Sequence, residues 1–476
     1  MKQSTLLILI FLTSFLGQSQ DCYVGTTMDF ALYLQNTCGI VYKEDGVPKN
    51  PYQSIKDHGG NIIRLRQDLP PYSNSFIENE PPVDFRSPLK VKENMQAAQA
   101  AGLKTLLTFS YQSFALDADE MLNPYVAPLE WQSIANNVDQ LADSVHDYTY
   151  NTLAGLIAEG LVPEIISIGN ETNWRILETN VTEANLPAYN PQRVVTLLNA
   201  GTSAVREINE TFGINIRIAL HIFGASNLNW WMNTHVPLGL DFDIMGLSHY
   251  HAWHNLGNFS SWTDVVEWVQ TNYQKDFMML ETAQLFSSGY SDNHANVLGT
   301  ENIPAGYPNP PTTDTQKNYL KDLTVEILDA GGLGTISWGG EWVGSDCYVY
   351  PDAYGPGSSW ENKAFWDFEN NLHDGINWME ESCPNNSVDD KYHEPQFNIY
   401  PVPVHSKAIT IQSVDIRIIK VIVTNIYGEI IETESVDAYI QPITIDLANN
   451  LPAGNYILQI VDEQFQSYYQ MISVFH

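Results

Sequence analysis

Short apolar runs alternate with amphipathic stretches along most of the chain, and this alternation predicts strands separated by helices. Each run is rich in aliphatic residues and has the length of a strand. Between the runs, stretches such as VKENMQAAQAAG (91–102) and TQKNYLKDLTVEILDAGG (315–332) have helical spacing and end in glycine, a favoured stop. The eight expected strands cover residues 23–30, 61–66, 104–110, 164–171, 216–222, 242–250, 277–283 and 334–340.

Eight strands that alternate with helices predict an α/β fold, a (β/α)8 TIM barrel over residues 21–385. The strands read as continuous apolar runs rather than alternating ones. A parallel sheet that is covered on both faces needs this pattern, because neither side of a strand then meets water.

The pattern changes after Cys383. Residues 386–396 are polar and predict a linker, and from residue 397 to 476 the helical spacing disappears. Short strands with turn residues between them follow, which predicts a small all-β, sandwich-like C-terminal domain. These strands are AITIQSV, RIIKVIVTNIYG, EIIETESV, QPITIDL, GNYILQIVD and YYQMISVF.

Charge and composition exclude some classes of binding partner. The 476 residues include 44% hydrophobic ones, enough for a large core, and 56 acidic against 22 basic residues give a formal net charge of −34. Nucleic acid and anionic membrane surfaces would be repelled, whereas a neutral polymer would not.

Residues 1–20 have the charged start, apolar stretch and small residues of a secretory signal peptide. No other apolar run reaches the roughly 18 residues that a membrane span needs. We therefore expect a secreted or cell-surface protein without a membrane span.

Four cysteines in an exported chain suggest disulfides rather than a zinc site, because no two have the CxxC spacing. Three pairings are possible. Proximity along the chain favours Cys22 with Cys38 and Cys347 with Cys383.

Two glutamates stand where apolar strands end. The stretch EIISIGNETNW places Glu171 after the fourth expected strand, and MMLETA places Glu281 in the seventh. Barrel enzymes carry their active groups at the carboxyl ends of strands, so these carboxyl groups can converge over one mouth. A pair about 5–5.5 Å apart can cleave a glycosidic bond with retention of configuration. Either glutamate alone could instead cap the following helix.

The sequence resembles glycoside hydrolase family 53, the endo-β-1,4-galactanases. The motifs PEIISIGNETN and MMLETA carry the resemblance, together with SIKDHGGNIIRLR, AAQAAGLKTLLTF, DFDIMGLSHYHAWH and GLGTISWGGEW, in consistent order over residues 23–345. The resemblance implies that Glu171 is the proton donor and that Glu281 is the nucleophile.

The same resemblance implies four substrate-binding roles. Asn170 would bind the sugar hydroxyl beside the reacting centre, and Arg64 would help hold the nucleophile ionised. Tyr250 would hydrogen-bond the nucleophile, and Trp338 would form the platform below the reacting sugar. Ion pairing at the barrel rim and core packing are the alternatives for Arg64 and Trp338. His221 also lies near a strand end, where a hydrogen-bonded histidine is common.

The stretch SGYSDNHANVLG resembles a calcium loop of some bacterial family members. Asp292, His294 and Asn296 match its ligand positions, whereas Tyr290 stands where that pattern has an aspartate. The resemblance implies a structural Ca²⁺, which accepts carboxylate and carbonyl oxygens. We expect that catalysis itself requires no cofactor.

The third expected strand departs from the family pattern. The family reads aspartate-phenylalanine-histidine-tyrosine-serine-aspartate, followed by threonine-tryptophan, where this chain has TFSYQSFALD. The sugar recognised beside this strand can therefore differ. The residues that depart are Thr108, Ser110, Gln112, Ser113, Phe114 and Ala115.

The tail resembles the C-terminal sorting domain of the type IX secretion system, on the motifs FNIYPVPV, VTNIYGEII and LPAGNYILQI. The resemblance implies that the type IX machinery is a partner. A carbohydrate-binding module is the alternative for this domain.

Together these features predict a secreted, retaining endo-hydrolase of β-1,4-galactan or arabinogalactan. A retaining endo-hydrolase of another β-glycan is an alternative, because the third strand is altered. A surface glycan-binding protein without catalysis is a second alternative.

Overall fold

The computed structural model describes residues 21–69, 85–111, 126–179, 187–345 and 357–383 of the N-terminal part. In the tail it describes residues 397–400, 408–413, 417–425, 430–435, 443–447, 451–462 and 467–474. The expected signal peptide (1–20) and linker (386–396) lie outside the described residues, so both stay predictions.

Eight parallel strands close into a barrel in the order β1-β10-β9-β8-β7-β6-β5-β4. Each of the eight apolar runs forms one of these strands, which confirms the predicted (β/α)8 barrel. The strands are β1 (Tyr23–Thr27), β4 (Ile62–Gln67), β5 (Lys104–Phe109), β6 (Ile165–Ile168), β7 (Arg217–Phe223), β8 (Ile244–Ser248), β9 (Asp276–Thr282) and β10 (Gly334–Ser337).

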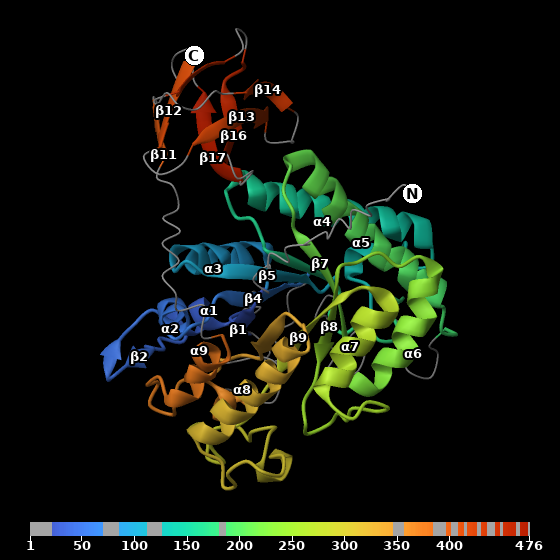
Figure 1. Cartoon of the computed structure of the whole chain (residues 1–476), viewed down its shortest axis with the longest axis vertical. Helices are drawn as coiled ribbons and strands as arrows, with labels where there is room; N and C mark the ends of the chain where they lie inside the picture. Colours follow the sequence, from blue (N-terminus) through green and yellow to red (C-terminus); the bar gives the residue numbers. More distant parts are fainter. Residues whose placement is uncertain are drawn as a thin grey trace, which may run out of the picture.

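Helices form an outer layer around these strands (Figure 1). A small hairpin of β2 (Lys43–Glu44) and β3 (Val47–Pro48) sits in the first connection. The helices are α1 (Ala31–Asn36), α2 (Pro51–Asp57), α3 (Pro88–Ala100), α4 (Val138–Ala158), α5 (Pro191–Phe212), α6 (Ala225–His235), α7 (Trp262–Tyr273), α8 (Thr313–Asp329) and α9 (Trp378–Ser382).

Local sequence sets the ends of the long helix α5. The Asn190 side chain accepts the backbone N–H of Arg193, and Pro191 takes the first helical position. Gly213 ends the helix at φ 64°, a left-handed conformation that glycine adopts without the steric cost of a β-carbon. Between the two caps, the apolar stripe of the helix packs into the core outside the barrel.

The interior of the barrel has an apolar floor and a polar mouth. Ile62, Leu106, Ala219 and Ile244 belong to one buried cluster inside the barrel. Because side chains alternate along a strand, the residue two positions further on each strand also points inward, nearer the carboxyl end. Those positions are polar on three of the four strands: they hold Arg64, Thr108, His221 and Gly246.

An irregularity in β9 changes the direction of one side chain. Leu247 pairs with Met279, but the next residue, Ser248, pairs with Glu281, so β9 holds one extra residue. Leu280 points into the barrel with the interior cluster, and strict alternation would turn Glu281 outward. A bulge re-aims the following side chain, and Glu281 accordingly points into the mouth, where it contacts Arg64.

The tail forms two antiparallel sheets, which confirms the predicted all-β domain. Alternating residues of both sheets, such as Ile409, Ile411, Leu458 and Ile460, form a separate buried core. One sheet contains, in order, β11 (Phe397–Tyr400), β12 (Ala408–Ser413) and β15 (Ile443–Asp446). The other sheet contains, in order, β14 (Ile430–Ser435), β13 (Ile418–Asn425), β16 (Gly454–Asp462) and β17 (Ser467–Val474).

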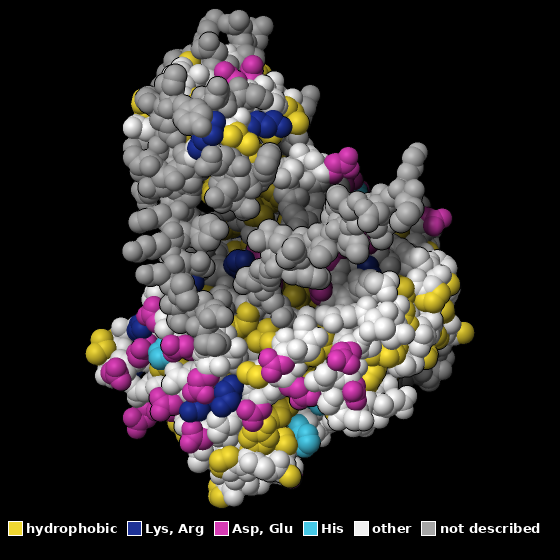
Figure 2. Space-filling view, viewed as in Figure 1, with side chains coloured by type: hydrophobic (Ala, Val, Ile, Leu, Met, Phe, Trp, Pro, Cys, Tyr) yellow, Lys and Arg dark blue, Asp and Glu magenta, His cyan; other side chains and the backbone are white. Residues whose placement is uncertain are grey.

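Acidic side chains are scattered over the face in Figure 2 rather than gathered into one patch. This distribution agrees with the net charge of −34 and with the absence of blocks of like charge in the sequence. Among the described residues, no helix combines the length and the apolar character that a bilayer crossing needs.

Both expected disulfide pairings are wrong. Cys22, just before β1, bonds to Cys383 at the end of α9, and the two residues are 361 positions apart in sequence. Cys38 is also disulfide-bonded. Proximity along the chain failed as a guide because barrel closure brings the first strand and the last helix together.

We predict that the Cys22–Cys383 bond stabilises the barrel, because it ties the start of the first strand to the last helix. Replacing both cysteines by serine should lower the free energy of unfolding by about 2–5 kcal/mol. Urea unfolding, followed by tryptophan fluorescence without reductant, measures this change. An unfolding midpoint equal to that of the unmodified protein would show that the bond contributes nothing.

Candidate active site

Glu171 lies on a tight turn just beyond β6. The strand ends at Ile168, so the expected strand 164–171 extends three residues too far at its carboxyl end. Gly169 has φ 79° and Glu171 itself has φ 52°. A non-glycine residue in this left-handed region is uncommon and is often found at functional sites. Here the conformation places the carboxyl group over the mouth of the barrel.

Hydrogen bonds fix this turn to the strands on both sides. Gly169 donates its backbone N–H to the Phe109 carbonyl at 2.9 Å, and Thr172 donates to the His221 carbonyl at 2.8 Å. The Asn173 side chain bonds both the N–H and the carbonyl of Phe223, each at 2.9 Å. The turn is therefore held by β5 and β7, which limits the positions open to Glu171.

Glu281 is held by two donors. Arg64 Nη1 donates to its Oε2 at 2.6 Å, and the Tyr250 hydroxyl donates to its Oε1 at 2.9 Å. Glu281 is 6% exposed and Arg64 is fully buried. The ion pair and hydrogen bond satisfy one lone pair on each oxygen, which leaves other lone pairs of the same carboxylate to face a substrate.

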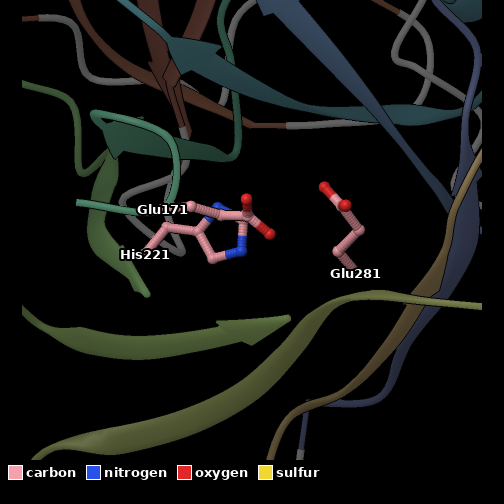
Figure 3. Close-up of side chains that lie close together, drawn as sticks. All are labelled: Glu171, His221 and Glu281. Carbon is pink, nitrogen blue, oxygen red and sulfur yellow. The ribbon is translucent and has the colours of Figure 1, made fainter. Parts of the chain in front are cut away.

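The two glutamates face each other across the mouth. Figure 3 shows the Glu281 carboxyl group turned toward Glu171 and His221. One carboxylate oxygen of Glu171, one of Glu281 and one ring nitrogen of His221 lie within 4.8 Å of one another. This separation fits the short spacing of retaining glycosidases and leaves no room for the water that inverting enzymes place between their carboxyl groups.

Arg64 contacts more than the nucleophile candidate. Its Nη2 donates to Asn170 Oδ1 at 2.6 Å, and its Nε donates to Thr108 Oγ1 at 3.2 Å. Nη2 also lies 3.4 Å from His221 Nδ1. Arg64 is therefore not a rim residue in an ordinary ion pair: it lies at the centre of the site and orients Asn170.

Burial, and then the negative charge of Glu281, raise the pKa of Glu171 to about 7. The nearby Ser248 hydroxyl and the charge of Arg64 act on this pKa in the opposite direction. Glu171 keeps partial exposure as a residue, which a group that meets substrate requires, while its carboxyl group lies in surroundings that disfavour charge. Glu171 therefore holds a proton at mildly acidic pH, as a general acid must.

Tyr250 stays protonated under the same conditions. Burial and the nearby carboxylates of Glu281 and Glu171 raise the pKa of its hydroxyl well above the usual value. The phenol is thus a permanent hydrogen-bond donor to Glu281 rather than a competing anion.

Trp338 follows β10 and is 7% exposed. Its backbone N–H donates to the Thr282 carbonyl at 2.7 Å. The guanidinium carbon of Arg66 lies 4.1 Å from the centre of its ring, and Trp342 packs against it at 5.3 Å. Core packing, the alternative role for Trp338, is partly right, because most of the ring is covered. The guanidinium of Arg66 also stacks on the ring and thereby fixes its plane at the mouth.

Further aromatic rings continue from this position. Trp253, which is 51% exposed, lies 5.1 Å from Tyr250 and 6.0 Å from Trp360 between ring centres. On the side of Glu171, Trp174 is 40% exposed and packs edge-on against Phe223. Exposed aromatic faces beside a pair of carboxyl groups suit the apolar faces of sugar rings.

The three expected calcium ligands lie on one loop after β9. The Asp292 oxygens accept backbone N–H groups from His294 at 2.7 Å and Ser358 at 2.6 Å. Asn296 donates its side-chain N–H to the Gly289 carbonyl at 3.1 Å. Backbone N–H groups of the protein thus already contact both oxygens of Asp292. Calcium binding by this loop stays a prediction.

Sequence reasoning missed Ser248 and Thr108 as members of the site and gave His221 little weight. Ser248 contacts His221, Thr108 contacts Arg64, and all three residues are fully buried. A polar residue near the carboxyl end of an apolar strand is the signal that could have identified each of them. The altered positions from Gln112 to Ala115 lie outside the described residues.

A closed (β/α)8 barrel with two carboxyl groups at short range over its mouth, one of them held protonated, defines a glycoside hydrolase of the two-carboxylate type. The family model of glycosyl hydrolase family 53 matches residues 23–379. The chain belongs to that family.

Curated relatives agree with this assignment. An arabinogalactan endo-β-1,4-galactanase of Cellvibrio japonicus is 32% identical over 347 residues, which cover 72% of this chain and 86% of the relative. An endo-β-1,4-galactanase of Bacillus subtilis is 25% identical and covers 75% of this chain and 77% of the relative. Among solved structures, the family 53 catalytic domain of Ignisphaera aggregans is 25% identical, with a TM-score of 0.62 over 77% of this chain and 97% of that domain.

The tail is a sorting domain. The model of the secretion system C-terminal sorting domain matches residues 398–474. The protein is therefore exported by the type IX route to the cell surface or the surrounding medium, and the tail is not the alternative carbohydrate-binding module.

We predict that Glu171 lowers the stability of the fold at neutral pH. Its pKa is about 7 against an ordinary value of 4.5, so the folded chain resists an ionisation that the unfolded chain undergoes freely. This penalty is absent below pH 4.5, grows as the pH rises to 7 and is constant above. Glu171→Gln, a neutral mimic, should raise the melting temperature at pH 8 and leave it unchanged at pH 4. An equal effect at both pH values would contradict the assigned cause.

Proposed function

We propose that this protein is a secreted, retaining endo-β-1,4-galactanase that acts on galactan or arabinogalactan. The observation that carries the proposal is the short separation of two unlike carboxyl groups, Glu171 and Glu281, at the mouth of a family 53 barrel. The names of the relatives from Cellvibrio japonicus and Bacillus subtilis support the substrate.

In the first step Glu281 attacks the anomeric carbon of the sugar. The bond between that carbon and the glycosidic oxygen breaks, and Glu171 gives its proton to the leaving oxygen. A covalent glycosyl ester on Glu281 results. The contacts of Glu281 with Arg64 and Tyr250 suit this role, because they orient the carboxylate while it carries the negative charge.

In the second step Glu171, now ionised, takes a proton from a water molecule, whose oxygen attacks the same carbon. The ester bond breaks, Glu281 regains its charge, and two inversions give net retention. Once Glu281 is an ester, its negative charge no longer acts on Glu171. The pKa of Glu171 then falls toward its ordinary value, which lets it act as the base.

Asn170 and Trp338 complete the substrate-binding set. Arg64 fixes the Asn170 oxygen, which leaves its amide N–H groups to bind the hydroxyl beside the reacting carbon, where hydrogen bonds strengthen in the transition state. Trp338 forms the platform under the reacting sugar, with Arg66 behind its ring.

A second candidate keeps the chemistry and changes the polymer. Thr108 and Ser110 stand where the resemblance expects aspartate and histidine, and both are buried near the mouth. Thr108 contacts Arg64 directly, so the altered strand reaches the centre of the site. This observation favours another β-glycan as the alternative substrate. A binding protein without catalysis is less consistent with a carboxyl group kept protonated opposite a second one.

We predict that Glu171→Gln or Glu281→Gln lowers kcat on β-1,4-galactan by at least about 10²–10⁴-fold, the usual value of acid–base assistance alone. Glu164→Gln is the matched control. Glu164 directly precedes β6, at the opposite end of the barrel, where it bonds Tyr23 and Lys104. Normal turnover in either active-site variant would defeat the assignment of roles.

The substrate is tested on a panel of β-linked polysaccharides with sizing of the products. We expect internal cleavage of β-1,4-galactan, with the β-anomer as the first product by NMR. Hydrolysis of a different β-glycan without any attack on galactan would establish the second candidate. Tight binding of galactan without new reducing ends would establish the binding protein.

We also propose that the loop of Asp292, His294 and Asn296 binds a structural Ca²⁺. Glu361 adds a second carboxylate: Ser291 donates to it through its backbone N–H, and Asp292 donates at 3.5 Å. Burial, with the charge of Asp292 as a lesser cause, raises the pKa of Glu361. Two neighbouring carboxylates form an oxygen-rich donor set that suits a hard cation.

We predict that EDTA lowers the melting temperature and that added Ca²⁺ restores it, whereas Asp292→Asn abolishes the response to both. Hydrolysis well below the melting temperature should be unaffected, because the loop does not contact the catalytic carboxyl groups. A melting temperature that is insensitive to EDTA and Ca²⁺ would show that the hydrogen bonds of the loop suffice without a metal.

A further inference from the structure

Lys363, a buried lysine with no part in the two reaction steps, contacts the backbone of Trp338. It is 2% exposed and ends the short 3₁₀ turn Glu361–Lys363. Lysine is almost never fully buried unless its charge is paired. Within the part of the chain that the structure describes, the partners of its nitrogen are two backbone carbonyls and two aromatic rings rather than a carboxylate. A buried amine with such partners suits a positioning role.

The Lys363 nitrogen holds the chain where β10 has ended. It donates to the carbonyl of Trp338 and, at 2.7 Å, to the carbonyl of Gly339. Because the strand stops at Ser337, both carbonyls lie beyond the regular pairing of the sheet. A β-carbon at Gly339 would lie 2.6 Å from the lysine nitrogen. Glycine at this position therefore gives the amine room to approach.

Both polar backbone groups of Trp338 are fixed in this way. Its N–H donates to the Thr282 carbonyl at 2.7 Å, and its carbonyl accepts from Lys363. These two bonds set the peptide planes on either side of the residue, and the planes determine the direction of the bond that carries the indole ring. The ring itself lies against Arg66. Trp338 is thus held at its backbone as well as at its ring.

The position of the amine is itself well defined. The Lys363 carbonyl accepts from the Gln316 side chain of α8 at 2.6 Å. The nitrogen lies 5.2 Å from the ring centre of Trp342 and 5.5 Å from that of Trp360, within the range of cation–π attraction. Burial lowers the pKa of Lys363 to about 7. A neutral amine still has two N–H groups for the two carbonyls, so these hydrogen bonds do not depend on the charge.

We propose that Lys363 is a positioning residue for the sugar platform: it fixes the backbone of Trp338 and thereby the plane on which the reacting sugar lies. The proposal rests on the proposed function for the role of Trp338 as the platform. Because Lys363 acts through the platform, the loss of its amine should matter to the reaction only while the indole ring is present.

The test is a double-mutant cycle between Lys363 and Trp338, measured as kcat/KM on β-1,4-galactan. Lys363→Met keeps a long apolar side chain and removes its donors. It should lower kcat/KM by roughly 10- to 100-fold, the scale of a small misplacement in an active site. In a Trp338→Ala background the same substitution should have no further effect, because residues that act through one another are not additive. Equal losses in both backgrounds would show a merely structural role and overturn the proposal.

Lys275→Met is the matched control. Lys275 directly precedes β9, at the opposite end of the barrel from the mouth. Its nitrogen likewise donates to a backbone carbonyl and lies over an aromatic ring, both of Phe242. This substitution should leave kcat/KM unchanged.

Lys363→Gln is a second variant, in case the methionine variant does not fold. It keeps an amide donor on a shorter stem, so it should lose less activity than Lys363→Met and show the same dependence on Trp338. Failure of both variants to fold would assign Lys363 to the stability of the fold and overturn the proposal.

A measurement without turnover separates this proposal from the proposed function. In protein labelled with fluorotryptophan, the ¹⁹F NMR signal of Trp338 is identified by its loss in Trp338→Phe. Lys363→Met should broaden or split this signal, as expected for a ring with several positions, and Lys275→Met should not. If the signal changes but no β-glycan is cleaved, the positioning contact is supported and the proposed function is wrong. An unchanged signal in an enzyme that cleaves galactan would overturn the positioning role alone.

Discussion

The site depends on one buried cation, the guanidinium of Arg64. Removing a charge from water is costly, and the cost is offset only when the charge is paired and its donors are satisfied. Here the donors meet Glu281, Asn170 and Thr108, and Nη2 also approaches His221. Losing a partner of such a buried pair typically destabilises a fold by about 3–5 kcal/mol. The contact that positions the Glu281 carboxylate is therefore the same contact that makes the burial of Arg64 tolerable.

The barrel makes this convergence possible because strand periodicity sorts side chains by depth. Inward positions near the amino ends are apolar and pack into a floor, whereas those near the carboxyl ends carry Arg64, Thr108 and His221. Each comes from a different strand, so none can move without shifting a packed sheet. Glu281 obeys this order only because β9 holds one extra residue before it. The bulge thus interrupts the regular pairing of β9 and β8 in order to direct the Glu281 carboxyl group inward.

The sequence predicted those parts of the structure that leave a local signal. Apolar runs identified all eight barrel strands, and an acidic residue at the end of such a run identified Glu171 and Glu281. Ser248 escaped notice because a single small hydroxyl in an apolar strand is also common in cores, and Thr108 was noticed only as a departure from the family pattern, not as a contact of Arg64. The bulge in β9 and the Cys22–Cys383 bond depend on which strands become neighbours, and a local pattern contains no record of that.

The unlike behaviour of two identical side chains follows from their donors. Glu281 receives a cation and a phenol at short range, so its charge is compensated where it forms. Glu171 is buried and faces the charge of Glu281, and these two effects raise its pKa to about 7. Because Arg64 contacts both Glu281 and Asn170, the residue next to Glu171, a shift of this one side chain would alter the surroundings of both carboxyl groups. The asymmetry that double displacement requires is thus set by the surroundings of each carboxyl group: two donors hold Glu281, whereas burial and a neighbouring charge act on Glu171.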